Sequence, residues 1–155
     1  MKIERARKEH IKGILHLLQQ VLMVHHEGRP DLFRPHATKY NAEELENMLS
    51  DDDRPIFVGL DEGGRVLGYA FCVLEQAGGH ALVPIKTLYL DDLCVDKPMR
   101  GKHVGQQIYA HVKAYAREQG CYNLTLNVWD CNPGARKFYD TLGLKPLKTY
   151  MEAIL

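Results

Sequence analysis

The spacing of apolar residues in this chain changes twice, and these changes limit the folds that it can adopt. From Ile56 to Val95 apolar residues form short runs broken by glycine pairs, as in strands. After Val95 helical spacing returns. Before residue 50 the apolar residues recur every three or four positions, as on one face of a helix: Ile11, Ile14, Leu15, Leu18, Val21 and Leu22. Such a chain has to cover a sheet with helices, so we expect an α/β layer fold.

Capping and turn residues divide these runs into elements. Asn41 with Glu44 resembles a capping box, Asn132 followed by proline favours a helix start, and Gly120 and Gly143 suit helix ends. No repeat or linker divides the 155 residues, so we expect one domain over 1–155. The expected elements are a helix over 8–24, a helix from 41 to about 51, a hairpin of strands 56–60 and 65–74, a strand over 85–95, a helix over 104–119, a strand over 122–128, a helix over 133–142 and a final strand pair over 144–155.

Composition excludes several classes of protein. Twenty basic and twenty acidic residues give no net charge, which argues against a nucleic-acid partner. No apolar run approaches the roughly 20 residues of a membrane span, and residues 1–9 are too charged for a secretory signal, so we expect a cytoplasmic protein with no membrane partner. The four cysteines lack CxxC spacing and the histidine-rich stretch 25–36 offers no i, i+4 pair on a helix. We therefore expect reduced thiols and no metal.

The charges are distributed unevenly between the two parts of the chain. Residues 1–95 carry 11 Lys and Arg against 15 Asp and Glu, whereas residues 96–155 carry 9 against 5. Chance is one explanation for so small an excess. The other is a bipolar cleft that holds an anion on the second part and a cation on the first. Charge alone does not choose between them.

The segment between Val95 and Gly105 joins an expected strand to an expected helix. It carries Lys97, Arg100 and Lys102, and Gly101 allows a tight turn. Backbone amides at the start of a helix point toward one centre, where they and the helix dipole favour a pyrophosphate. The loop matches neither GxxxxGK[ST] nor GxGxxG, so it is neither a P-loop nor a dinucleotide fingerprint.

This segment resembles the acyl-CoA loop of the GNAT superfamily of N-acetyltransferases, whose usual form is R/Q-x-x-G-x-G/A, here Arg100-x-x-His103-x-Gly105. Residues 132–144 look like the second signature of that family, N-x-x-A-x-x-F-Y-x-x-x-G-F, and one helix and one strand separate the two, as in the family. The resemblance covers essentially the whole chain and implies a mixed, mostly antiparallel central sheet flanked by helices. One departure is His103, which stands where the middle glycine is usual.

The resemblance implies acetyl-CoA as co-substrate and assigns residues to it. The backbone of residues 93–95 would pair with the pantetheine arm where this strand splays from the strand over 122–128. Asn132 would contact the pantetheine or order its loop, or serve only as a helix cap. The implied acetyl-CoA-binding residues are Leu93, Cys94, Val95, Arg100, Gly101, Lys102, His103, Val104, Gly105, Gln106, Asn132 and Ala135.

Acetyl transfer to an amine needs a proton acceptor for the amine and a proton donor for the departing thiolate. The resemblance places Tyr139 as the donor. Asp91 and Asp92 are candidates for the base or for amine binding, and we rank Asp91 first because the run 89–95 is similar to the same strand of spermidine/spermine acetyltransferases. Adjacent strand residues face opposite sides unless a bulge intervenes, so only one is expected in the cleft. Glu27, Asp31 and Tyr89 are expected on the acceptor side.

The sequence thus predicts transfer of an acetyl group from acetyl-CoA to a primary amine of a small cationic molecule or a protein, by direct attack in a ternary complex. Two alternatives remain at this stage: a non-catalytic acyl-CoA-binding sensor, suggested by His103, and a nucleotide-dependent enzyme that uses the basic loop. A homodimer is expected only by analogy with other small acetyltransferases.

Overall fold

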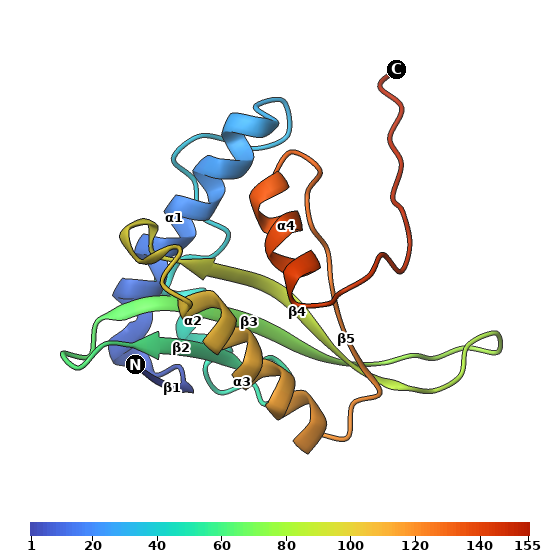
Figure 1. Cartoon of the computed structure of the whole chain (residues 1–155), viewed down its shortest axis with the longest axis horizontal. Helices are drawn as coiled ribbons and strands as arrows, with labels where there is room; N and C mark the ends of the chain where they lie inside the picture. Colours follow the sequence, from blue (N-terminus) through green and yellow to red (C-terminus); the bar gives the residue numbers. More distant parts are fainter.

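A five-stranded sheet in the order β1-β2-β3-β4-β5 runs through the structure, a computed structural model that describes all residues 1–155 (Figure 1). Neighbouring strands are antiparallel except β4 and β5, which are parallel. The elements are β1 (Lys2–Arg5), α1 (Ile11–Gly28), α2 (Ala42–Met48), β2 (Ile56–Leu60), β3 (Val66–Gln76), β4 (Lys86–Val95), α3 (Val104–Glu118), β5 (Asn123–Leu126) and α4 (Pro133–Thr141), with short 3-10 turns at Lys8–His10 and Lys97–Met99. This is the mixed, mostly antiparallel α/β fold that the sequence predicts.

Helices cover both faces of the sheet and bury a separate core on each. The core under α1 and α2 includes Ile14, Leu17, Leu18, Leu45, Val58, Tyr69 and Phe71. The core under α3, which crosses the opposite face in Figure 1, includes Phe57, Ala70, Leu88, Leu90, Ile108 and Val112. No helix has both the length and the apolar character needed to cross a bilayer.

The capping residues act as predicted. The Asn41 side chain accepts a hydrogen bond from the Glu44 amide at 2.9 Å, and the Glu44 carboxylate accepts one from the Asn41 amide at 2.7 Å. Asn132 accepts a hydrogen bond from the Ala135 amide at 3.1 Å and so begins α4. Gly120, just past the end of α3, has a φ of 70°, a left-handed conformation that glycine adopts without strain.

Two expectations about strands are wrong. The sequence analysis misses β1, which has only four residues and pairs with β2 from Lys2 opposite Leu60 to Arg5 opposite Phe57. Its charged residues give no apolar alternation, so only the pairing reveals it. The final strand pair over 144–155 does not form: no strand follows α4, and residues 145–155 make no backbone hydrogen bond. Strand β5 is also shorter than the predicted 122–128.

Gly68 provides a test of how closely α3 packs on the sheet. A Cβ at this position would lie 2.8 Å from the Cys94 carbonyl oxygen and 2.8 Å from Ile108 Cδ1. We expect Gly68→Ala to lower the free energy of unfolding by about 1–3 kcal/mol, because the backbone carbonyl cannot move away. Gly78→Ala is the matched control, since open space surrounds that position, and it should change stability by about 0.5 kcal/mol or less. Urea denaturation measures both, and equal effects would contradict the packing argument.

Candidate functional site

Strand β5 pairs with only the first half of β4. They pair from Thr87 opposite Asn123 to Leu90 opposite Leu126, and no pairing continues beyond that point. The edge of β4 over residues 91–95 therefore has no strand beside it on the β5 side. Backbone groups alternate in direction along an antiparallel strand, so those of Leu93 and Val95 face this open side while those of Cys94 face β3. The Val95 carbonyl already accepts a hydrogen bond from the Arg100 side chain.

A β-bulge at Asp91 changes the direction of the side chains along β4. Leu90 lies opposite Cys72 and Asp92 lies opposite Phe71, so Asp91 has no partner on β3. Leu90 before the bulge and Leu93 after it both pack into the core under α3. The two residues between them, Asp91 and Asp92, must then both face the α1 and α2 side. The bulge brings together two carboxylates that simple alternation would place on opposite faces.

The Asp91 carboxylate is held by the segment that joins α1 to α2. Lys39 Nζ lies 2.6 Å from Asp91 Oδ2, and the Tyr40 hydroxyl lies 3.5 Å from the same atom. Burial acts to lower the pKa of Lys39, but the hydrogen bond and charge of Asp91 outweigh it and raise the pKa above its usual value. Asp91 therefore already binds a primary ammonium group. The sequence analysis missed Lys39 and Tyr40, which lie in a polar stretch with no motif.

Asp92 has a different environment, although it is the next residue. Its Oδ2 accepts a hydrogen bond of 2.8 Å from the hydroxyl of Tyr69, which is fully buried, and it forms no salt bridge. Burial raises the pKa of Asp92 to about 6, against the smaller lowering effects of the Tyr69 hydrogen bond and the Lys39 charge. Asp92 is thus ionised at neutral pH but close enough to its pKa to accept a proton.

Tyr139 enters the same region from α4. It is half-buried and packs against the core under α3. Burial, followed by the charge of Asp92, raises the pKa of Tyr139 above its usual value. The phenol therefore keeps its proton at neutral pH. Tyr89 of β4 lies nearby along the sheet, where its hydroxyl accepts a 3.0 Å hydrogen bond from the Asn127 side chain just past β5.

The loop before α3 has the geometry of an anion site. Gly101 and His103 both have left-handed backbones, with φ of 77° and 61°. The first-turn amides of α3, on Val104, Gly105 and Gln106, have neither a side-chain cap nor a backbone acceptor. The three expected cations, Lys97, Arg100 and Lys102, are exposed. The Arg100 side chain also donates a 3.1 Å hydrogen bond to the Val95 carbonyl. Free amides, a helix N-terminus and three cations fit a diphosphate.

His103 occupies a left-handed position that a glycine would adopt without strain. Its side chain is exposed and bonds to the Gln106 side chain within the first turn of α3. At Gly105, in contrast, a Cβ would approach Phe138 to 3.2 Å and Val95 to 3.3 Å. Glycine at 105 lets the helix N-terminus lie close to α4 and the end of β4.

The expected acceptor residues Glu27 and Asp31 are not gathered with Asp91 and Asp92 by any contact. Glu27 is exposed at the end of α1. Asp31 is bound by Arg29 at 2.7 Å, and the same guanidinium binds Glu152 at 2.8 Å. Beside them, Phe33 lies between His25 and Trp129, with ring centroids 5.1 Å and 5.0 Å away. The structure gathers no cluster of three His, Cys, Asp or Glu side chains that could hold a metal ion.

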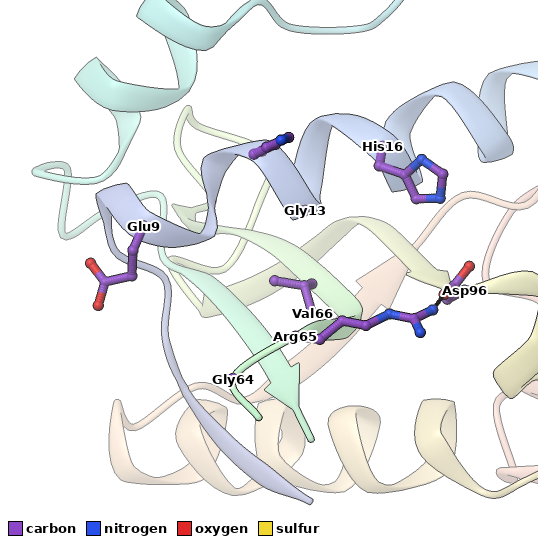
Figure 2. Close-up of a pocket in the computed structure, with 8 residues that line it drawn as sticks. Glu9, Gly13, His16, Gly64, Arg65, Val66 and Asp96 are labelled. Carbon is purple, nitrogen blue, oxygen red and sulfur yellow. Dashed lines mark hydrogen bonds and ion pairs between the residues drawn. The ribbon is translucent and has the colours of Figure 1, made fainter. Parts of the chain in front are cut away.

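A hollow of about 520 Å³ lies beside the N-terminal half of α1 and is separate from Asp91, Asp92 and Tyr139 (Figure 2). Figure 2 shows Arg65 reaching along it to the buried Asp96. Asp96 also accepts a 2.8 Å hydrogen bond from Gln20, whose side-chain oxygen accepts one of 3.0 Å from the Lys97 amide. These contacts tie α1 to the start of the anion-binding loop, and Asp96 is structural.

Comparison with known proteins shows the family of the chain. The model of the acetyltransferase (GNAT) family matches residues 21–144. A probable glucosamine 6-phosphate N-acetyltransferase of Drosophila melanogaster is 29% identical over 133 residues, which are 85% of this chain but only 54% of that protein. A thialysine N-epsilon-acetyltransferase of Bos taurus is 36% identical over 89 residues, 57% of this chain and 50% of that protein. The chain thus spans about half the length of these two relatives.

A crystal structure of a mutant BH1408 protein from Bacillus halodurans superposes with a TM-score of 0.95 at 28% identity, covering 100% of this chain and 99% of that one. The family match covers most of the chain, including the anion-binding loop, both strand carboxylates and Tyr139. The chain belongs to the acetyltransferase (GNAT) family.

Proposed function

We propose that this protein transfers the acetyl group of acetyl-CoA to a primary amine of a small cationic molecule. The observation that carries the proposal is the pair of carboxylates on one face of β4, one already bound to an ammonium group and the other with a pKa of about 6. The acetyltransferases to which the chain is similar are named for amine acceptors, glucosamine 6-phosphate and thialysine. The likeness to spermidine/spermine acetyltransferases in residues 89–95 agrees with a cationic acceptor.

Acetyl-CoA would be held from two directions. The free amides of Val104, Gly105 and Gln106 suit its diphosphate, together with Gly101, His103 and the cations of the loop. The open edge of β4, where the backbone groups of Leu93 and Val95 face outward on either side of Cys94, suits the amides of its pantetheine arm. Asn132 and Ala135 lie at the start of α4, where the Asn132 side chain accepts a hydrogen bond from the Ala135 amide. The co-substrate supplies the activated thioester.

The residues of this chain then divide the proton transfers between them. Asp91 binds the acceptor as an ammonium ion, in place of Lys39. Asp92 takes a proton from that ammonium, and the nitrogen lone pair attacks the thioester carbonyl. The new C–N bond forms as the C–S bond breaks, and Tyr139 gives its proton to the departing sulfur. The second proton of the nitrogen returns through solvent to the Tyr139 oxygen, and Asp92 releases its proton to water. The products are an acetamide and free CoA thiol. We therefore assign the base to Asp92 and amine binding to Asp91, a division that the sequence leaves open.

The direct test is release of CoA thiol from acetyl-CoA in the presence of a panel of amines. The panel includes glucosamine 6-phosphate, thialysine, a polyamine and a lysine peptide. We expect turnover with at least one small amine and less with the peptide. Tight binding of acetyl-CoA without turnover on any amine would overturn the proposal in favour of a non-catalytic acyl-CoA sensor.

The pH dependence separates the roles of Asp91 and Asp92. If Asp92 is the base, kcat/KM falls below pH about 6, because the carboxylate becomes protonated there. Asp92→Asn should lower kcat by about 10²–10⁴-fold and remove this acidic limb. Asp91→Asn is the matched control: it should raise the KM of the amine and keep the limb. A limb that survives in Asp92→Asn would assign the proton transfer to another group.

Tyr139→Phe tests the proton donor. Removing the hydroxyl should lower kcat by about 10²-fold or more while the dissociation constant of acetyl-CoA stays the same, because the phenol acts on the leaving group. Tyr109→Phe, a buried phenol of α3 in the same core, is the control and should leave kcat within about twofold. Steady-state kinetics and calorimetric titration measure the two quantities. Equal effects of both substitutions would show that Tyr139 only fills the core.

Lys39→Met tests competition for Asp91. The substitution frees the carboxylate from its 2.6 Å ion pair but keeps a side chain of similar length. We expect the KM of a cationic amine to fall several-fold, because the acceptor no longer displaces an internal ammonium group. The KM of acetyl-CoA serves as the internal control and should stay the same. A rise in the KM of the amine would instead show that Lys39 helps to hold the acceptor.

A further inference from the structure

Asp96 stands just before the short turn Lys97–Met99, at a position where an aspartate commonly caps the turn with its own side chain. Here its side chain forms no such cap. The buried carboxylate instead accepts a 2.8 Å hydrogen bond from the Gln20 carboxamide of α1 and pairs with the Arg65 guanidinium (Figure 2). The turn therefore lacks the cap that its own sequence offers.

Gln20 supplies this cap from another element. Its side-chain oxygen accepts a 3.0 Å hydrogen bond from the Lys97 amide, which has no backbone acceptor. Its side-chain nitrogen donates to Asp96 and also lies 3.0 Å from the ring of the exposed His16. A carboxamide contains both a donor and an acceptor. One side chain thus satisfies the first amide of the turn and the buried carboxylate before it, two groups that are costly to leave unpaired.

The capped turn is the first part of the anion-binding loop, residues 97–103. The Arg100 amide donates to the Lys97 carbonyl at 3.3 Å, and the Lys102 amide donates to the Met99 carbonyl at 3.4 Å. These successive hydrogen bonds link the position of Lys97 to the rest of the loop and to the free amides at the start of α3. A shift at Lys97 would therefore move the groups that suit the diphosphate.

Helix α1, which contains Gln20, is closely packed on the sheet. A Cβ at Gly13 would lie 2.7 Å from Val66 Cγ2 at the start of β3, so α1 approaches the sheet more closely there than a side chain would allow. Farther along α1, the Leu17 carbonyl accepts a 3.5 Å hydrogen bond from the Cys94 thiol near the end of β4. Gln20 follows about one turn later. It therefore extends from a helix whose position relative to β3 and β4 is fixed.

We propose that Gln20 is a positioning residue for acetyl-CoA, which holds the anion-binding loop in the conformation that receives the diphosphate. This inference rests on the proposed function for the identity of the ligand. Gln20 acts through the Lys97 amide and need not touch the co-substrate. A loop that is ordered before binding loses less conformational entropy when the ligand arrives, and its affinity is correspondingly higher.

Gln20→Met tests the proposal, because it removes both hydrogen bonds and keeps a side chain of similar length. Calorimetric titration with CoA measures the affinity without requiring turnover. We expect the Kd of CoA to rise about tenfold. Gln19→Met is the matched control, an exposed glutamine one position earlier on α1, and it should leave the Kd within about twofold. An unchanged Kd in a Gln20→Met protein that folds, as judged by circular dichroism, overturns the proposal.

S-Acetylpantetheine separates positioning of the loop from a general loss of structure, because this thioester lacks the diphosphate. In Gln20→Met, kcat/KM for acetyl-CoA should fall about tenfold through a rise in KM, while kcat/KM for S-acetylpantetheine stays within about twofold. Equal losses with the two thioesters overturn the proposal. A wild type that binds CoA but acetylates no amine overturns the proposed function instead, and the calorimetric titration then decides the role of Gln20.

Amide exchange of the wild type, followed by NMR, needs no variant. After correction for intrinsic rates, the Lys97 amide should exchange at least about tenfold more slowly than the Gly101 amide, which has no backbone acceptor. In Gln20→Met the difference between the two amides should disappear. Equal exchange of the two amides in the wild type overturns the proposal, because Gln20 would then not hold the turn.

Discussion

The β-bulge at Asp91 is the local constraint on which the arrangement of the site depends. It adds one residue to β4 opposite β3, and this reverses which side chains face each layer of helices. Without it, one of the two carboxylates would point into the core under α3, where an unpaired charge costs several kcal/mol, about 3–5 by analogy with broken buried ion pairs. The bulge lies one residue past the last pair between β4 and β5. The change in side-chain direction along β4 and the end of its pairing with β5 thus occur at the same place.

The two carboxylates differ because their neighbours differ. Asp91 faces the ammonium group of Lys39, whereas Asp92 has only the neutral hydroxyl of Tyr69. Adjacent groups whose environments separate their pKa values can take different roles in proton transfer. The raised pKa of Asp92 also lowers the stability of the fold at neutral pH. The folded state binds this proton more tightly than the unfolded state does. The stabilisation is therefore complete below the unfolded pKa near 4 and is lost as pH rises through about 6. The loss is about 3 kcal/mol at neutral pH.

Local signals in the sequence predicted most of the fold, because caps, glycines and apolar spacing act over a few residues. Asn41, Asn132 and Gly120 are examples, and each has the predicted geometry. The bulge had no such signal, since it depends on how β3 and β4 align. Lys39 reaches Asp91 across 52 residues of sequence, a contact that only the packing of the segment between α1 and α2 creates. Residues 144–155 had a strand-like pattern, but such a pattern does not ensure that the chain pairs, and no strand forms there.

The uneven charge distribution along the sequence leaves fewer free carboxylates in the structure than a bipolar cleft would require. Arg29 binds Asp31 and Lys39 binds Asp91, so two of the acidic residues on the acceptor side already have a cation. Half-exposed ion pairs of this kind contribute only about 1 kcal/mol or less. In the proposed reaction, an acceptor ammonium would displace Lys39 from Asp91 at little cost, because the half-exposed Lys39 ammonium can turn into solvent. In the proposed reaction, selectivity among amines would then come from the shape and polarity around Asp91, where Tyr40 lies, rather than from net charge.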